Sequence, residues 1–262
     1  MSNPLIIYGV PFSQPVRAVL WLMLYKQKSF ELALINPGSS SEGGSRHPDY
    51  LAKFPTGTIP SIEDKESGFV LSESHAIMCY LCNKYNWTDL YPSNHEERAK
   101  VDSYLHLHHR NVREASIGLV APKVRKDLNF SEDFLKISQA NIEKAFKALE
   151  NGWLAQSRFL TGDNLTIADM SAYVEIGQLQ SKFTNVYDFE PLPNITRWLE
   201  EMNQVAYHDE VHASLYELGD ISSEAPSMET IISANKTGFA FNSRTASQYE
   251  RPIIHDSNSK TG

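Results

Sequence analysis

Ser13 is the first residue in this sequence whose surroundings suggest reactivity. It falls between a short apolar run, 5–10, and a stretch with helical spacing, 16–25, so its hydroxyl is expected at a helix N-terminus. A hydroxyl there can donate a charge-assisted hydrogen bond to an anion, and the helix dipole adds to the stabilisation. The alternatives are that Ser13 only caps the helix, or that the hydroxyl of Tyr8 does the chemistry. Because Tyr8 lies inside the apolar run, we prefer Ser13.

Glu73 and Ser74 form a second polar pair, at the start of another stretch with helical spacing. The hydroxyl of Ser74 and the first N–H groups of that helix can hold a carboxylate, and Glu73 can pair with an ammonium group. The simpler alternative is a plain helix cap beside an acidic residue, which is common at helix starts. The residues alone leave both interpretations open.

His106, His108 and His109 suggest a metal site, and Cys79 and Cys82 have the C-x-x-C spacing of a redox pair. No Cys or acidic ligand lies at a characteristic spacing from the histidines, so we predict no metal. A redox pair belongs at the start of a helix, where the dipole activates the thiol. These two cysteines lie in mid-helix among apolar neighbours, so we predict that they are small core residues.

The segments that must position these residues alternate between strand and helix in the first third of the chain. Short apolar or alternating runs predict strands, and runs with 3.6-residue spacing predict helices. The predicted elements are a strand over 5–10, a helix over 16–25, a strand over 30–35, a short helix over 47–54, a hairpin over 58–63 and 69–72, and a helix over 73–85. Their order, β-α-β-α-β-β-α, is the thioredoxin-type α/β layout.

From residue 95 onward the sequence predicts only helices. They are expected over 95–120, 131–151, 163–177, 195–205 and 209–218. Thr166 and Asp169 fit a capping box at the start of one of them. We therefore divide the chain into a thioredoxin-like domain (1–86), a linker (87–94), an all-helical domain (95–218) and a polar tail (219–262).

The tail contains neither Leu nor Val and is rich in Ser and Thr. Such a composition buries too little apolar surface to offset the entropy of ordering on its own. The tail is therefore expected either to be disordered or to lie over the preformed body as a lid. Phe239 and Phe241 are its best docking residues.

Composition and charge exclude several classes of protein. Asp and Glu total 32 against 24 Lys and Arg, a net charge of −8, which argues against binding to nucleic acid or to anionic membranes. Two cysteines cannot build a disulfide scaffold, and no apolar run reaches the roughly 18 residues of a membrane span. The N-terminus lacks the basic segment of a signal peptide. We expect a reduced, cytoplasmic protein.

Four segments, in this order and spacing, resemble the theta class of cytosolic glutathione transferases. They are SQPVRAVL at 13–20, resembling S-Q-P-x-R-A-V; HPDYL at 47–51 with PTGTIP at 55–60, resembling P-E-Y/F-L…N-P-x-G-x-V-P; LSESHAI at 71–77, resembling L-x-E-S-x-A-I; and VDSYLHLHHRNVR at 101–113, resembling V-D-x-x-L-x-W-H-H-x-N-L-R. The match covers about residues 5–215. It implies a thioredoxin-like glutathione-binding domain followed by an all-helical domain that forms the electrophile pocket.

The resemblance also implies a reaction and its residues. Ser13 would stabilise the thiolate of glutathione, whose free thiol has a pKa near 8.5, and each unit of lowering takes about 1.4 kcal/mol. The main chain of Ile59, before a cis proline, would pair with the bound peptide like an added strand. Arg17 is expected to hold the first helix in place. The glutathione-binding residues implied are His47, Thr58, Ile59, Pro60, Glu73 and Ser74, and the pocket residues are His109 and Arg113.

These implications define the expected activity and its rivals. Glutathione would be the co-substrate, conjugated to a small hydrophobic electrophile in detoxification, by a homodimer without metal. A glutathione-dependent dehalogenase or peroxidase sub-activity is an alternative. Thr58 and Leu107 depart from the family pattern, so a binding protein without catalysis remains the alternative. A reductase with a Cys nucleophile is disfavoured, because Ser13 occupies that place.

Overall fold

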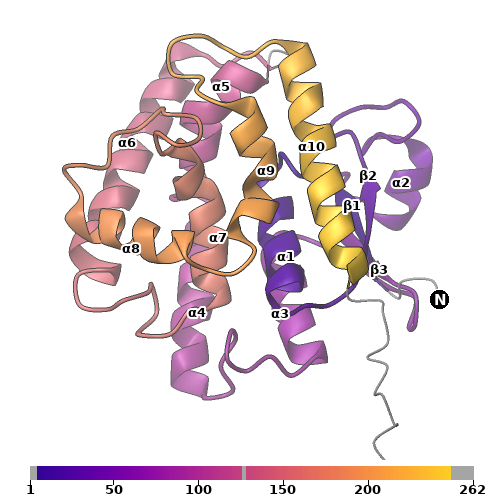
Figure 1. The fold of residues 1–262 in the computed structure, drawn as a ribbon, viewed down its shortest axis with the longest axis horizontal. Helices are drawn as coiled ribbons and strands as arrows, with labels where there is room; N and C mark the ends of the chain where they lie inside the picture. The colour runs from indigo at the N-terminus through magenta and orange to yellow at the C-terminus, as the bar shows by residue number, and fades with distance from the viewer. Residues whose placement is uncertain (1–4, 126–127, 249–262) are drawn as a thin grey trace, which may run out of the picture.

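The computed structural model describes residues 5–125 and 128–248 of the 262-residue chain. A mixed sheet lies at one side of the molecule and helices make up the rest (Figure 1). The elements up to residue 84 are β1 (Leu5–Gly9), α1 (Gln14–Tyr25), β2 (Glu31–Leu34), α2 (Pro48–Lys53), β3 (Ser61–Asp64), β4 (Phe69–Ser72) and α3 (Ser74–Lys84). The later elements are α4 (His95–His108), η1 (Ala115–Val120), α5 (Ala121–Val124), α6 (Glu132–Ala148), η2 (Leu149–Trp153), α7 (Ile167–Ile176), η3 (Gly177–Leu179), α8 (Pro193–Asn203), α9 (His208–Leu218) and α10 (Met228–Ser247).

The sheet has the strand order β2-β1-β3-β4. β1 runs parallel to β2, whereas the β1–β3 and β3–β4 pairs are antiparallel. Ile7 of β1 faces Ile62 of β3 across the ladder, and both side chains are fully buried. The predicted β-α-β-α-β-β-α order and the thioredoxin-like layout are confirmed.

Helix α1 is the central element between the sheet domain and the helical domain. It contacts α3 on one side and α7 and α9 on the other. Its apolar residues are so completely enclosed that Trp21 has no exposed surface, and the indole Nε1 donates a 2.9 Å hydrogen bond to the carbonyl of Ala206. The start of α1, where Ser13 lies, is therefore held rigidly against both domains.

The predicted single helix over 95–120 is wrong. Helix α4 ends at His108, a turn follows, and the chain resumes as the π-helix η1 from Ala115. The side chain of Asn111 donates to the carbonyl of Leu107, and the N–H of Arg113 bonds to His108, five residues back rather than four. A side chain that competes for the main-chain carbonyls in this way disfavours the regular helix.

Helix α7 starts with the predicted capping box. The carboxylate of Asp169 accepts the N–H of Thr166 at 3.0 Å, which confirms the reciprocal cap. Every residue of α7 is buried, so this helix forms the centre of the helical domain.

Residues 228–247 form the helix α10, which the sequence did not predict. Its buried face consists of small and polar residues rather than Leu and Val: Ala234, Gly238, Asn242, Thr245 and Ala246. Figure 1 shows α10 beside α9 at the sheet side of the molecule, where it also contacts β2. Phe241 is 40% exposed and does not dock, whereas Phe239 packs against the core. Residues 249–262 lie outside the described ranges. No helix in those ranges combines the length and apolar character needed to cross a membrane.

Candidate active site

Ser13 lies at the N-terminus of α1, as predicted, but it does not cap that helix through its side chain. The loop 10–13 ends in a turn in which the N–H of Ser13 bonds to the carbonyl of Val10 at 3.0 Å. Pro15 occupies the first turn of α1 and has no N–H to donate. The Ser13 hydroxyl is thus not used by its own helix, and the residue lines a cavity of about 360 Å³.

Tyr8, the competing hydroxyl, is engaged elsewhere. Its OH donates to Glu63 Oε2 of the neighbouring strand β3 at 2.7 Å. Burial, together with this carboxylate, raises the pKa of Tyr8 well above its usual range. Tyr8 lines neither the Ser13 cavity nor the cavity next to it.

A smaller cavity of about 180 Å³ lies next to the Ser13 cavity, and Thr58, Ile59 and Arg113 line both. Most of the predicted site residues meet here. Those that line this second cavity are Thr58, Ile59, Pro60, Glu73, Ser74, His109 and Arg113. The Ile59–Pro60 peptide bond is cis. In the described residues the main chain of Ile59 makes no hydrogen bond, so both of its polar groups are free for a ligand.

Glu73 precedes α3 with φ 76° and ψ 114°, a backbone conformation that non-glycine residues rarely adopt. Such a conformation costs on the order of 1–3 kcal/mol and is typical of ligand sites, where the rest of the fold maintains it. The side chain of Glu73 makes no capping bond to α3. Its carboxylate is therefore available beside the free start of the helix.

His47 is not brought to either cavity. It precedes α2, where its Nδ1 accepts the N–H of Asp49 at 3.4 Å and caps the helix. The geometry gives it a local structural contact and no contact with the residues around Ser13.

Behind Arg113 lies a buried carboxylate that the sequence analysis missed. Glu175 of α7 is 1% exposed, and its Oε1 lies 2.5 Å from Arg113 Nη1. Ser116 donates its hydroxyl to the other carboxylate oxygen, and His108 Nε2 lies 3.8 Å from Oε1. Burial raises the pKa of Glu175, but the charge of Arg113 and the contact with His108 outweigh burial and lower it to about 2.

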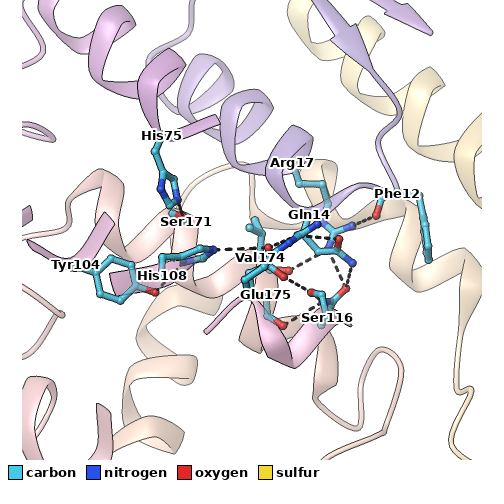
Figure 2. Close-up of polar contacts among 12 residues, drawn as sticks. Phe12, Gln14, Arg17, His75, Tyr104, His108, Ser116, Ser171, Val174 and Glu175 are labelled. Carbon is cyan, nitrogen blue, oxygen red and sulfur yellow. Dashed lines mark hydrogen bonds and ion pairs between the residues drawn. The ribbon is translucent and has the colours of Figure 1, made fainter. Parts of the chain in front are cut away.

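Two glutamine side chains and Arg17 connect this carboxylate to the start of α1 (Figure 2). Gln14 Nε2 donates to Gln178 Oε1 at 2.8 Å, and Gln178 in turn donates to the hydroxyl of Ser116. Arg17 donates to the carbonyls of Phe12 at 2.7 Å and of Val174 at 3.1 Å. The predicted role of Arg17 in holding α1 agrees with these contacts.

Glu175 and Gln178 did carry a signal in the sequence. They are polar residues three apart in the run Ile167–Leu179, whose other members are largely apolar. On a helix such a spacing places both on one face, and a buried charge needs a partner. Such a pair of polar residues in an apolar run therefore predicts a buried contact with another part of the chain.

The cysteines and histidines considered for redox or metal sites lie in surroundings typical of structural residues. Burial raises the pKa of Cys79 to about 11 and that of Cys82 to about 12, which is the opposite of an activated thiol. His108 is buried and contacts the hydroxyl of Tyr104 at 3.3 Å, whereas His106 is exposed. Among the described residues no cluster of His, Cys, Asp or Glu has the arrangement of a metal site.

Comparison with known proteins assigns both parts of the chain to families. Residues 7–93 match the model of the glutathione S-transferase N-terminal domain, and residues 112–205 match that of the C-terminal domain. Glutathione S-transferase T3 of Arabidopsis thaliana is 30% identical over 246 residues, which is 88% of this chain and 40% of the relative. Human glutathione S-transferase theta-1 is 27% identical over 83% of this chain and 91% of the relative. The chain thus spans about 40% of the length of the Arabidopsis T3 and T2 proteins.

Solved structures give the same picture for the fold. The apo form of human glutathione S-transferase T1-1 superimposes with a TM-score of 0.69 over 92% of this chain and all of that chain, at 24% identity. Glutathione transferase F2 from Populus trichocarpa has a TM-score of 0.68 over 79% of this chain and 97% of that chain, at 29% identity. With the N-terminal and C-terminal domain models in order along one sequence, and relatives of theta type, this chain belongs to the glutathione S-transferase family.

Proposed function

We propose that the protein conjugates the thiolate of glutathione to small electrophiles, with Ser13 stabilising the thiolate. The observation that carries the proposal is Ser13, which lines a cavity at the start of α1 and whose hydroxyl is not used as a cap. A thiol of pKa near 8.5 is only a few per cent ionised at neutral pH. A hydroxyl donor and the N-terminal end of a helix both favour the charged form.

The second cavity suits the rest of the glutathione molecule. The free main chain of Ile59 supports pairing with the cysteinyl unit, like an added strand. Ser74 and the first N–H groups of α3 would hold the γ-glutamyl carboxylate, and Glu73 would pair with its ammonium group. His109 and Arg113 form the opposite wall.

A third cavity, of about 730 Å³, supports a hydrophobic electrophile. It adjoins the Ser13 cavity, with which it shares Val10, Phe12 and Val124. Apolar residues of α10 also line it, among them Met228, Ile231 and Ile232, so the tail helix would act as the lid of the electrophile pocket. A panel of organic halides, epoxides, peroxides and activated alkenes tests which class of electrophile the protein takes.

We also propose a homodimer. Phe69 and Val70 on the edge strand β4 and Leu107 near the end of α4 are exposed apolar side chains, which a second copy would cover. Sedimentation or light scattering of the purified protein tests this, and a monomer at micromolar concentration would refute it.

The test of the main proposal is a titration of bound glutathione, in which thiolate absorbance is followed against pH. The wild type is expected to lower the thiol pKa below about 8.5, and Ser13→Ala to return it toward that value. Tyr8→Phe is the matched control, because it removes the competing hydroxyl, and its titration should match the wild type. An unshifted thiol pKa for glutathione bound to the wild type would refute the proposal and favour the alternative, a protein that binds without catalysis. If the thiol pKa in Ser13→Ala matches that in the wild type, a donor other than Ser13 stabilises the thiolate.

A further inference from the structure

A hydrogen bond connects the tail helix to the residue directly before Ser13. The side chain of Asn235 on α10 accepts the N–H of Phe12 through Oδ1 at 3.2 Å, across 223 residues of sequence. The Nδ2 of the same amide donates to the carbonyl of Ile231 at 3.2 Å, one turn earlier in α10. This second bond orients the amide, because it directs the NH₂ group toward its own helix and leaves the oxygen for Phe12.

The other main-chain groups of the loop 10–13 are also held. The carbonyl of Phe12 accepts from Arg17 at 2.7 Å, and that of Pro11 accepts from Ser214 of α9 at 3.4 Å. The N–H of Ser13 bonds to Val10 at 3.0 Å. Among these main-chain groups of the loop 10–13, only the Phe12 N–H is bonded to α10.

The close seating of α10 makes this contact rigid. Gly238, nearly one turn beyond Asn235, packs on the loop so tightly that a Cβ there would lie 2.8 Å from the Cβ of Pro11. Asn242, fully buried, donates to the carbonyl of Gly238 at 2.7 Å and so fixes the next turn. α10 therefore contacts two successive loop residues, Pro11 through Gly238 and Phe12 through Asn235.

We propose that Asn235 is a positioning residue, which sets the direction of the Ser13 hydroxyl by fixing the Pro11–Phe12 peptide, one residue before it. The inference rests on the function proposed above. A charge-assisted hydrogen bond to sulfur depends steeply on the direction of the donor. Without Asn235 the Pro11–Phe12 peptide would be held only through its carbonyl, by the long 3.4 Å contacts with Ser214 and Arg17, which would spread that direction. The tail helix would then contribute to thiolate formation as well as to the wall of the electrophile pocket.

The test compares Asn235→Leu, which removes the acceptor, with Asn235→Asp, which keeps an oxygen in its place. Arg244→Met is the matched control, because Arg244 is exposed on the same helix, lines none of the three cavities and does not bond to the loop. Two readouts are taken on the full chain. One is hydrogen exchange of the Phe12 amide without ligand, and the other is the pH profile of conjugation with glutathione.

In Asn235→Leu the Phe12 amide is expected to exchange about five- to tenfold faster, the loss expected for one hydrogen bond. The kcat of the Asn235→Leu variant should fall about tenfold at a pH below the pKa of the glutathione thiol and recover at a pH above it. The KM for glutathione should be nearly unchanged. A purely structural defect would not recover at high pH. Asn235→Asp should keep the slow exchange of the Phe12 amide, and Arg244→Met should behave like the wild type in both readouts.

The outcomes separate the two claims. Unchanged Phe12 exchange in Asn235→Leu, or a kcat defect independent of pH, would overturn the positioning role. A wild type that does not lower the thiol pKa would refute the proposed function, whatever the exchange data show. If Asn235→Leu fails to fold, Asn235→Ala, which also removes the acceptor, is measured in its place, and wild-type exchange of the Phe12 amide in that variant would overturn the inference.

Discussion

Arg113 Nη1 lies 2.5 Å from Glu175 Oε1, so the cation that faces both cavities is already paired with a buried carboxylate. The charge of Arg113 is therefore largely neutralised before any ligand arrives. An anionic ligand would meet an oriented guanidinium group rather than a free positive charge. Arg113 would therefore contribute less to the affinity for the ligand and more to its orientation.

Glu175→Gln should destabilise the protein by about 2–4 kcal/mol at pH 7, because it leaves Arg113 without its partner. The folded pKa of Glu175 is depressed to about 2, so its stabilisation is fully present above about pH 4.5 and is lost as the pH falls through 2. The difference in unfolding free energy between wild type and variant should therefore shrink on acidification. Denaturant unfolding at several pH values measures it.

The control for that experiment is Glu200→Gln, because Glu200 is an exposed acid on α8. It should change stability by less than about 0.5 kcal/mol. A Glu175→Gln variant as stable as this control would contradict the importance of the pair.

Glu73→Gly should raise stability and lower affinity for glutathione. The backbone strain at φ 76° is relieved in glycine, with an expected gain of up to about 1 kcal/mol in the free energy of unfolding. Loss of the carboxylate should weaken glutathione binding about tenfold, which titration calorimetry measures. Gln27→Gly is the matched control, since Gln27 has φ 49° at an exposed position outside the cavities, and it should change stability only. Equal glutathione affinities in the two variants would contradict the binding role.

Stability should fall as the pH decreases from 6.5 to about 4. Burial lowers the pKa of His208 to about 4, below its unfolded value, so its neutral form contributes stability above pH 6.5 that is lost toward pH 4. His75, His108 and His212 have pKa values shifted in the same direction by burial. His208→Gln should reduce the slope of unfolding free energy against pH by up to about 1.4 kcal/mol per pH unit.

Denaturant midpoints between pH 7 and pH 4 provide the measurement for the histidines. His106→Gln should leave the slope unchanged, because His106 is an exposed residue of α4. A wild-type free energy of unfolding that does not change between pH 7 and pH 4 would contradict the prediction that these histidines are buried in the neutral form.

Cys79 and Cys82 should be inert in the folded protein. With pKa values of about 11 and 12, their thiolate fractions at neutral pH are at least about a hundredfold below that of a free cysteine. A thiol reagent should label them only after unfolding, and the double change to Ser should keep the conjugating activity. Rapid labelling of the native protein would instead revive a redox role for the pair.

The sequence predicted the elements whose signals are local. The strand before Ser13, the helix after it and the box of Thr166 and Asp169 depend on neighbours within a few residues, and the structure contains all three. It could not predict where Glu175 and Asn235 would find their partners, because those partners lie 62 and 223 residues away. Only the packed tertiary structure brings such groups together.

Three differences between the sequence predictions and the structure have a specific physical origin. Helix α10 lacked an apolar stripe, since residues such as Gly238 and Asn242 form its buried face, and hydrophobic periodicity does not detect close packing of small residues. The long helix over 95–120 was broken by the side chain of Asn111, which takes a main-chain carbonyl that a regular helix would use. His47 was assigned from its place in a motif, which carries no information on the direction of a side chain.

The buried guanidinium of Arg17 has a consequence for cooperativity. Its partners, the carbonyls of Phe12 and Val174, come from the two domains, and it has no exposed surface. Burial lowers its pKa to about 9, so it remains a cation at neutral pH. Separating the domains would break those bonds and would leave each domain with an incomplete hydrophobic core. The two domains should therefore melt in one transition, with a calorimetric enthalpy equal to the van't Hoff value.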